Sequence, residues 1–512
     1  MATLVRRSLY NAAAGMTMLL TGFASSIITA RLLGPEANGT VAFAFWLTTT
    51  GTLVAGLGSD VLLPRMLPQL KANGFDERRR RGFVAFIAQF VALAVLAALA
   101  VFWFVNHETE DTAWALGTSP VVAVTGVLFL LQSIGTLTVN TLIGEQQPMI
   151  FFRLTIVASV LQLIATIIGA LWYGEAGALG GYLASYIVFF LYALRLVLVR
   201  PDRCGSSLGD LARASAFISM GTIIESIFLN RVELAFLQHF QGIHSVGFYA
   251  IGLTLSNLAL QLPVQLSGTL VPYYTELAHK RGSTRLPVHL FEDVIRVLAY
   301  MTLPMGFGLA AISTEVVQDI FGPDFAAAGS VVALLAISAP LSVFAQISTK
   351  YLFAIGQEQP RMIIGVIGAL IISLGCLAAV PYLGDEGAAL VRILMLLTIS
   401  ILMVLRMDFE GSLRGMVVSL VKIGTASLAC AGVAYAVTTS IDGLIGAACA
   451  IVCGAIVYVL ALKILHAVPE QDALSVMRLS DRLPGNWALL ARRFAVFMSG
   501  KPNDDHAPSH AE

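Results

Sequence analysis

Charged residues are scarce in this chain, and their scarcity excludes a water-soluble globular protein. Only 12% of the 512 residues are Asp, Glu, Lys or Arg, whereas a soluble domain carries about 25%. Hydrophobic residues make up 57% of the sequence, and the mean hydropathy is +0.82. The chain is therefore expected to reside in a membrane.

Cysteine is also rare, and its placement excludes two kinds of site. Of five cysteines, Cys204 lies in an expected loop, and Cys376, Cys430, Cys449 and Cys453 lie within expected spans. This pattern predicts neither a disulfide framework nor a zinc site. The sequence has no Walker A motif, so the chain is not expected to hydrolyse ATP itself. No cofactor is predicted, and the energy source is a gradient, the membrane potential, a partner or downhill substrate flow.

Long apolar segments fill most of the sequence. Each is near or above about 20 residues, the length an α-helix needs to cross a hydrocarbon core about 30 Å thick. They are unbroken apolar runs and not ten-residue alternations, which favours helices over strands. About fourteen spans are expected, at 9–33, 39–63, 82–106, 114–138, 151–173, 176–198, 214–237, 245–270, 290–313, 328–352, 362–383, 386–406, 415–437 and 443–465. The expected fold class is an all-α polytopic membrane protein.

The distribution of basic residues predicts the orientation, because Lys and Arg accumulate in cytoplasmic loops. A cytoplasmic N-terminus places all but three of the 31 Lys and Arg residues in or beside inside segments. The run Arg78–Arg81 is one such basic stretch, and we interpret it as a topology signal and a contact for anionic lipid. The exceptions are Arg31, Arg231 and Arg392. Both termini are expected on the cytoplasmic side of a bacterial inner membrane.

The sequence contains an internal repeat with a spacing near 210 residues. The matches pair Gly34 with Gly242, Gly39 with Gly247, Ile143–Pro148 with Ile355–Pro360, and Gly174–Ala178 with Gly384–Ala388. Six expected helices separate equivalent positions, so both halves keep the same orientation and a two-fold axis along the membrane normal should relate them. The repeat therefore predicts two pseudo-symmetric six-helix lobes around a central cavity.

The expected spans and the repeat together predict the domain organisation. Helices 1–6 form an N-terminal lobe at 1–208, and helices 7–12 form a C-terminal lobe at 209–408. Two further helices, 13 and 14, occupy 409–466. The remaining residues, 467–512, are expected to form a cytoplasmic tail that is first interfacial and then disordered.

Several short motifs resemble bacterial polysaccharide and O-antigen flippases. Ala30–Glu36, followed by Gly39, is similar to the first-loop signature of that family. Three further segments are similar to its seventh helix, the entry to its eighth helix and its ninth-to-tenth connection: Asn230–Glu233, Val246–Ala250 and Phe321–Phe325. The flippases belong to the multidrug, oligosaccharidyl-lipid and polysaccharide exporter superfamily.

The resemblance implies a function in surface polysaccharide biosynthesis. A flippase of this kind carries an undecaprenyl-diphosphate-linked oligosaccharide from the cytoplasmic to the periplasmic leaflet by alternating access. Its implied partners are the lipid-linked substrate, membrane lipids and the polysaccharide polymerase machinery, with no nucleic acid. Two alternatives from the same superfamily stay open: a multidrug or cation antiporter, and a peptidoglycan-precursor lipid flippase. A membrane glycan polymerase or ligase is disfavoured, because such enzymes carry a large outside loop and every expected outside loop here is short.

Polar residues within the spans are the candidates for substrate binding, because a diphosphate needs a polar and preferably cationic cavity. An Arg near a helix centre costs about 2.5 to 3.5 kcal/mol on insertion scales and therefore needs compensation. Arg31, Arg231 and Arg392 are predicted to line the cavity together with Asn230, since Arg contacts phosphate bidentately. Snorkelling to the interface remains the alternative for Arg31, and contacts between helices remain the alternative for the other two.

The remaining candidate functional residues are two acids on the seventh span and three residues near the cytoplasmic face. Glu225 and Glu233 are candidates to carry a proton in a coupled cycle, with a structural pairing as the alternative. Asp60, Arg153 and Lys350 lie toward the cytoplasmic ends of their spans. They are predicted to form an entry for substrate from the inner leaflet, with snorkelling or pairing as the alternative.

Overall fold

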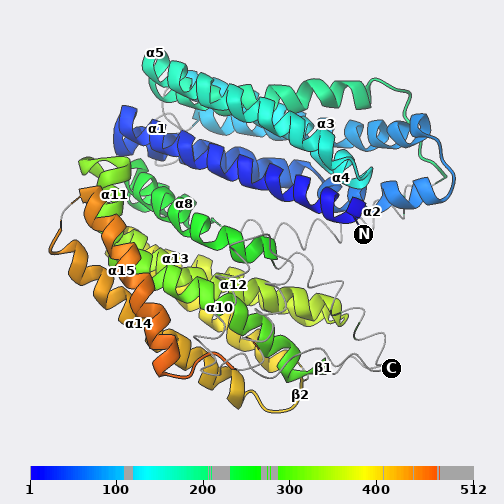
Figure 1. The fold of residues 1–512 in the computed structure, drawn as a ribbon. Coiled ribbons are helices and arrows are strands. Elements are labelled where there is room, and N and C mark those ends of the chain that lie inside the picture. The colour runs from blue at the N-terminus through cyan, green and yellow to red at the C-terminus, as the bar shows by residue number, and fades with distance from the viewer. Residues whose placement is uncertain are drawn as a thin grey trace, which may run out of the picture. The chain divides into compact units, whose positions relative to one another are not determined.

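The computed structural model is almost entirely helical and describes most of the chain (Figure 1). The described ranges are 2–108, 119–205, 231–266, 286–407, 409–441 and 443–469, with the single residues 207, 209, 274, 277 and 472. Within these ranges, nine helices are long and apolar enough to cross a membrane. The expected all-α membrane fold is therefore confirmed, while the count of fourteen spans stays a prediction.

Three helices are about twice as long as a single span requires. They are α1 (Ala2–Ala55), α5 (Pro148–Val197) and α13 (Glu358–Arg406). Each changes direction at one glycine with a positive φ, at Gly34 (φ 82°), Gly174 (φ 59°) and Gly384 (φ 57°). Glycine adopts this conformation without the steric penalty that a Cβ imposes. Each break lies between two spans that the sequence predicts separately.

The second half of α5 returns along the first half with almost no space between the two backbones. A Cβ added at Gly169 or at Gly177 would overlap the carbonyl group of the other glycine. Gly181 similarly lies against Thr166, where no side chain would fit. The same reversal brings Gly375 against Val391 in α13. The turn glycines and the contact glycines together make α5 and α13 each a hairpin of two closely packed spans.

A first compact unit comprises Met1–Thr284 and Ser313–Asp408. In its N-terminal part, α1, α4 (Ser119–Gly144) and α5 lie side by side (Figure 1). Next to them are α2 (Ser59–Ala72) and α3 (Glu77–Glu108), and a core that includes Leu63, Phe83 and Leu137 joins α2, α3 and α4. The remaining elements of the unit are α7 (Glu233–Phe240), α8 (Ile243–Leu266), α11 (Ser313–Phe321), the 3-10 helix η3 (Pro323–Ala328) and α12 (Gly329–Ala354), with α13.

A second compact unit comprises Arg285–Ile312 and Phe409–Glu512. It contains α10 (Val288–Ala311), α14 (Arg414–Thr438) and α15 (Gly443–Ile464), and the strands β1 (Leu286–Pro287) and β2 (Phe409–Glu410) pair in parallel. Its polar centre is Arg296, which donates to Asp472 at 2.6 Å and to Asp293 at 2.7 Å. The sequence predicts α10 within the lobe at 209–408. In the structure, α10 instead groups with α14 and α15, the two helices that follow that lobe.

One boundary within the expected spans differs from the structure. The span expected at 39–63 ends at Ala55, and α2 begins separately at Ser59. Between them, Leu57 (φ 50°) and Gly58 (φ 72°) both adopt left-handed backbone conformations, which end the first helix. The apolar pattern continues across this break, so hydropathy alone does not reveal it.

Large apolar side chains are exposed on the outer faces of several helices. Trp172 is 75% exposed, Trp103 is 68% exposed and Ile445 is 74% exposed. In water such surfaces would promote aggregation, whereas the hydrocarbon core of a bilayer covers them without cost. The exposure pattern is what a membrane-embedded helical protein requires.

The two repeats meet where α1 crosses α8. A Cβ at Gly39 would overlap the carbonyl oxygen of Ile243, and a Cβ at Gly247 would overlap the carbonyl oxygen of Pro35. These contacts are equivalent, because Gly247 and Ile243 lie 208 residues after Gly39 and Pro35. Asn38 Nδ2 also donates to the carbonyl oxygen of Gly247 at 3.2 Å. The pseudo-symmetric crossing therefore tolerates no side chain at either glycine.

Alanine at this crossing should destabilise the protein. Gly39→Ala and Gly247→Ala force the α1 and α8 backbones apart, and such overpacking costs about 1 to 3 kcal/mol. Thermal unfolding in detergent should show a lower midpoint for both variants. Gly180→Ala is the matched control, because a Cβ there has no neighbour within 4 Å. Equal midpoints for Gly247→Ala and Gly180→Ala would contradict the tight crossing.

Candidate functional site

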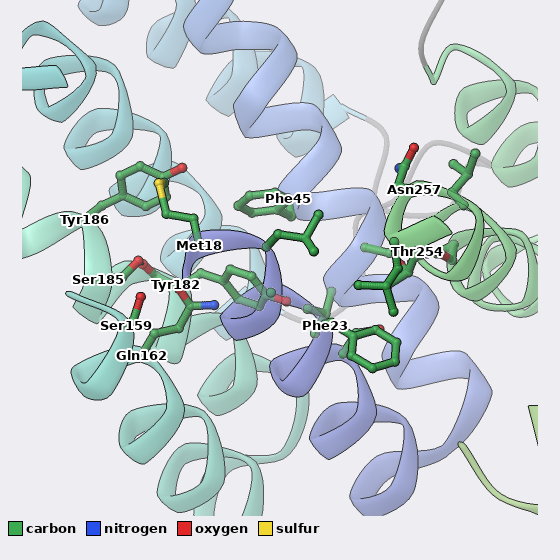
Figure 2. A pocket seen from close by; sticks show the side chains of 18 of the residues that line it. Met18, Phe23, Phe45, Ser159, Gln162, Tyr182, Ser185, Tyr186, Thr254 and Asn257 are labelled. Carbon is green, nitrogen blue, oxygen red and sulfur yellow. Dashed lines mark hydrogen bonds between the residues drawn. The ribbon is translucent and has the colours of Figure 1, made fainter. Parts of the chain in front are cut away.

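A cavity of about 280 Å³ lies within the first unit, where α1, α5 and α8 come together (Figure 2). The first half of α1 contributes Met18 and Phe23, and its second half contributes Asn38 and Phe45. Asn38 also takes part in the α1–α8 crossing, so the cavity begins directly beside that contact. The crossing therefore borders the cavity.

One wall of the cavity is formed by both halves of the α5 hairpin. Ser159 and Gln162 come from the first half, and Tyr182, Ser185 and Tyr186 come from the second. In Figure 2 these five side chains gather on the same side of the cavity. Residues three and four apart share a helix face, which explains why the positions 182, 185 and 186 act together. This α5 wall is polar and aromatic but carries no charge.

The opposite wall is formed by α8. Thr254 and Asn257 line the cavity there, and Figure 2 shows them across from the α5 wall. The Thr254 hydroxyl donates to the carbonyl oxygen of Ala250 at 2.7 Å, one turn earlier in the helix. Its hydrogen is therefore used within α8, and Asn257 is the more available polar group on this side.

Arg231 supplies the positive charge of the cavity. It is half-buried, lies just before α7, and is the only charged residue among the described residues that line the cavity. It interacts electrostatically with Tyr182, Glu233 and Arg392. A cation in a poorly hydrated cavity favours an anionic ligand, because the local dielectric screens the attraction less than water does.

Arg392 forms a buried ion pair instead of lining the cavity. Its Nη1 donates to Glu233 Oε1 at 2.7 Å, and this pair joins α13 to α7. Glu233 is 0% exposed and Arg392 is 9% exposed. The Tyr249 hydroxyl from α8 also donates to Glu233 Oε1, at 3.4 Å. Glu233 thus compensates Arg392 locally, and these two predicted site residues contact each other and not the described cavity surface.

Arg31 contacts α11 instead of the cavity. Its Nε donates to the carbonyl oxygen of Ile320 at 2.7 Å, and its Nη2 donates to the carbonyl oxygen of Asp319. Both acceptors are in the last turn of α11, where the helix dipole favours a cation. The side chain is exposed. In this arrangement Arg31 ties α1 to α11 and is not part of the described cavity lining.

The remaining predicted site residues are not brought to the cavity. Asn230 and Glu225 lie outside the described residues. Asp60 is half-buried in the first turn of α2, Arg153 is exposed on α5, and Lys350 is half-buried on α12. None of the three is among the described lining residues. Their role as an entry for substrate stays a prediction.

The basic run at the start of α3 is largely used for structure. Arg80 makes a bidentate contact with Glu145 at 2.7 and 3.0 Å and also donates to the carbonyl oxygen of Phe75. Arg79 donates to Asp202 at 2.8 Å, and this hydrogen bond holds the pKa of Asp202 below its ordinary value. These contacts fix the loops at this end of the N-terminal helices.

The uncharged lining residues were not predicted from the sequence, because the prediction relied on charged residues within the spans. Gln162, Tyr182, Tyr186 and Asn257 are neutral, and tyrosine or glutamine in an apolar run is not exceptional by itself. A position-by-position comparison of the two repeats carries the missing signal, because Tyr182 stands 210 residues before Arg392. Equivalent positions with such different chemistry indicate a surface at which the two lobes have diverged.

Sequence comparisons match the chain to a family model and to a named relative. The family described as "Polysaccharide biosynthesis protein" matches residues 28–330, which is more than half of the chain. The succinoglycan biosynthesis transport protein ExoT of Rhizobium meliloti (strain 1021) is 24% identical over 418 residues, covering 78% of this chain and 79% of ExoT.

Two solved structures share the fold. The lipid II flippase MurJ in an inward closed conformation superposes with a TM-score of 0.69 at 15% identity, covering 90% of this chain and 98% of MurJ. An inward-facing multidrug resistance MATE family transporter of the MOP superfamily gives a TM-score of 0.60 at 14% identity, covering 78% of this chain and 96% of the transporter. At these identities the likeness concerns the fold alone.

Removing one partner of the Arg392–Glu233 pair should destabilise the protein strongly. Glu233→Gln and Arg392→Gln each leave an uncompensated buried charge, which costs about 3 to 5 kcal/mol. The double variant Glu233→Gln/Arg392→Gln should cost less than the sum of the two single variants. Unfolding free energies in a double-mutant cycle measure this coupling.

The exposed pair between Arg81 and Glu77 provides the control for that cycle. Its side chains are 44% and 63% exposed, so Glu77→Gln should cost no more than about 1 kcal/mol. If the effects of Glu233→Gln and Arg392→Gln were simply additive, the proposed compensation between the two charges would be wrong.

Proposed function

The chain belongs to the polysaccharide biosynthesis protein family, and from that premise we propose that it is a lipid-linked oligosaccharide flippase. It carries an undecaprenyl-diphosphate-linked oligosaccharide from the cytoplasmic to the periplasmic leaflet of a bacterial inner membrane. The chain is a multi-pass membrane protein, and its relatives are named as transporters and flippases and not as enzymes.

The observation that carries the proposal is the cavity with Arg231 as its only described charge. A diphosphate is an anion, and a guanidinium binds phosphate oxygens through two parallel charge-assisted hydrogen bonds. The pairing of Arg392 with Glu233 leaves Arg231 as the cation that faces the cavity. A single cation beside neutral polar groups suits a substrate that couples an anionic diphosphate to sugar residues.

The tight α1–α8 crossing supports a transport cycle in which the cavity opens to one side at a time. The crossing lies beside Gly34, in a loop that the basic-residue distribution places on the periplasmic side. With that orientation, the close contact of α1 with α8 would form the periplasmic gate of the proposed cycle. Separation of Gly39 from Gly247 is the movement that would open this gate and release the substrate.

The charge of the cavity bears differently on the two alternative transport functions. An antiporter of cationic drugs needs an acid in its cavity to bind drug or proton, whereas the described lining contains no Asp or Glu. A peptidoglycan-precursor flippase carries the same lipid diphosphate, so the cavity charge fits it equally well. Membership of a polysaccharide biosynthesis family favours the oligosaccharide.

Loss of the Arg231 charge should abolish transport in the native organism. In a strain deleted for this gene, we expect undecaprenyl-linked glycan to accumulate and the surface polysaccharide to disappear. Expression of the wild-type chain should restore the polymer, and Arg231→Gln should restore less than about one tenth of it, since one lost charge-assisted contact weakens binding by about 1.5 to 3 kcal/mol. Mass spectrometry of extracted lipids and quantification of surface sugar measure both effects.

Arg406→Gln is the matched control, because Arg406 is an exposed arginine at the end of α13. It should restore the polymer fully at the same level of protein in the membrane. Full restoration by Arg231→Gln would contradict the assigned role of the cavity charge. A deletion phenotype limited to drug sensitivity would favour the antiporter, and accumulation of peptidoglycan precursor would favour the second alternative.

A further inference from the structure

The two repeats place different chemistry at equivalent positions around the cavity. Gly174 and Gly384 turn α5 and α13 with nearly the same backbone angles, φ 59°, ψ −133° and φ 57°, ψ −138°. Because these turns are equivalent, a shift of 210 residues relates the spans on either side of them. The shift therefore permits a comparison of the α5 wall with its counterpart in the second repeat.

Three polar positions of the α5 wall are apolar in the second repeat, while another, Tyr182, corresponds to Arg392, which is paired with Glu233. Gln162 corresponds to Ile372, Ser185 to Met395, and Tyr186 to Leu396. All three counterparts are apolar and buried, with exposures of 0%, 0% and 7%. The fold therefore does not require polar groups at these positions. The presence of Gln162, Ser185 and Tyr186 in the first repeat points to a ligand that touches that side of the cavity.

Polar groups in a transmembrane wall need partners, and this wall leaves some capacity for a ligand. Thr155 is among the residues that line the cavity, and within the described part of the chain its Oγ1 has no hydrogen-bond partner although the residue is 0% exposed. Gln162 Nε2 donates to Ser25 Oγ at 3.0 Å. That hydrogen bond fixes the orientation of the amide, and its carbonyl oxygen can still accept two hydrogen bonds.

Aromatic rings stand among these hydroxyl and amide groups. Tyr182 packs against Phe45, with the ring centroids 4.9 Å apart, and Tyr186 follows one turn later in α5. A tyrosine offers a flat apolar face and a hydroxyl that donates and accepts. Sugars present the complementary surfaces, with C–H groups on the faces of the ring and hydroxyl groups around its edge. An uncharged wall of this kind suits neither a phosphate nor a hydrocarbon chain.

We propose that the α5 wall, formed by Ser159, Gln162, Tyr182, Ser185 and Tyr186, is a subsite for the sugar residues next to the diphosphate. The subsite is distinct from Arg231, which binds the diphosphate itself. Neutral sugar residues bind through ring stacking and hydroxyl contacts on the first repeat, while the phosphate oxygens face Arg231 at the start of α7. This inference rests on the proposed flippase function and adds a separate determinant of glycan specificity.

The test compares two lipids that differ only in the glycan. The probes are undecaprenyl diphosphate and the lipid-linked oligosaccharide extracted from the deletion strain, each titrated into the purified full-length protein in detergent. Native mass spectrometry gives the two affinities. For the wild-type protein, we expect the glycan-bearing lipid to bind at least about tenfold more tightly than undecaprenyl diphosphate.

Variants of the wall should affect only the contribution of the glycan. Gln162→Leu and Tyr186→Phe together should reduce the tenfold preference to less than about twofold and leave the affinity for undecaprenyl diphosphate unchanged. Tyr186→Phe alone removes a single hydroxyl and should reduce the preference partially, which keeps the test available if the double variant does not fold. Tyr173→Phe is the matched control, because Tyr173 is on α5 but is 73% exposed on its outer face.

The outcomes separate the subsite from the flippase function. Equal binding of the two lipids by the wild-type protein would overturn the sugar subsite while leaving the flippase proposal in place. A loss of undecaprenyl diphosphate affinity in Tyr186→Phe as large as the loss for the glycan-bearing lipid would also overturn it. If the wild-type protein bound neither lipid, the proposed function would fail, and the subsite with it.

Discussion

The ion pair between Arg392 and Glu233 determines which charge the cavity presents. Two arginines lie close to one glutamate in this part of the protein, and a buried charge without compensation is expensive in a membrane. Glu233 directs one of its oxygens to Arg392 at 2.7 Å and accepts a second contact from Tyr249. Arg392 is thereby held between α7 and α13, while Arg231 remains at the surface of the cavity. The substrate chemistry proposed for the protein depends on this division of roles.

Glycine determines how closely the helices around that cavity approach. In α5 the contact between Gly169 and Gly177 brings two halves of a hairpin together, and in the α1–α8 crossing Gly39 and Gly247 bring two repeats together. In lipid, the hydrocarbon tails are as apolar as the helix surfaces, so no hydrophobic effect drives the helices together. Helix association therefore relies on close packing. The same small residues thus bring the helices together beside the cavity.

The sequence predicted the fold class and the family, and both predictions are confirmed. The separate spans predicted on either side of Gly174 and Gly384 required a reversal of direction at each, and glycine adopts the left-handed conformation found there without a steric penalty. The break at Leu57 and Gly58 was not predicted, since apolar residues continue through it. Sequence hydropathy reports the environment of a segment and not the backbone angle at one residue.

The site was only partly predictable for a related reason. Arg231 and Arg392 both stand out in the sequence as charges within apolar spans. In the structure, Arg392 forms an ion pair with Glu233, which is 159 residues away in the sequence, whereas Arg231 lines the cavity. Such a pairing depends on tertiary structure and has no local signal. The α5 wall is uncharged. Burial of an arginine in a membrane is costly and therefore marks it as a candidate, but this criterion does not apply to Tyr182 or Gln162.

Translocation in reconstituted liposomes tests the central claim most directly. The purified protein would be incorporated into liposomes with lipid-linked oligosaccharide in both leaflets, and the fraction accessible to a membrane-impermeant glycan-modifying reagent would be followed over time. The account predicts that nearly all of the glycan becomes accessible in liposomes containing the protein, against about half in protein-free liposomes. An accessible fraction that stayed at the protein-free level would contradict it.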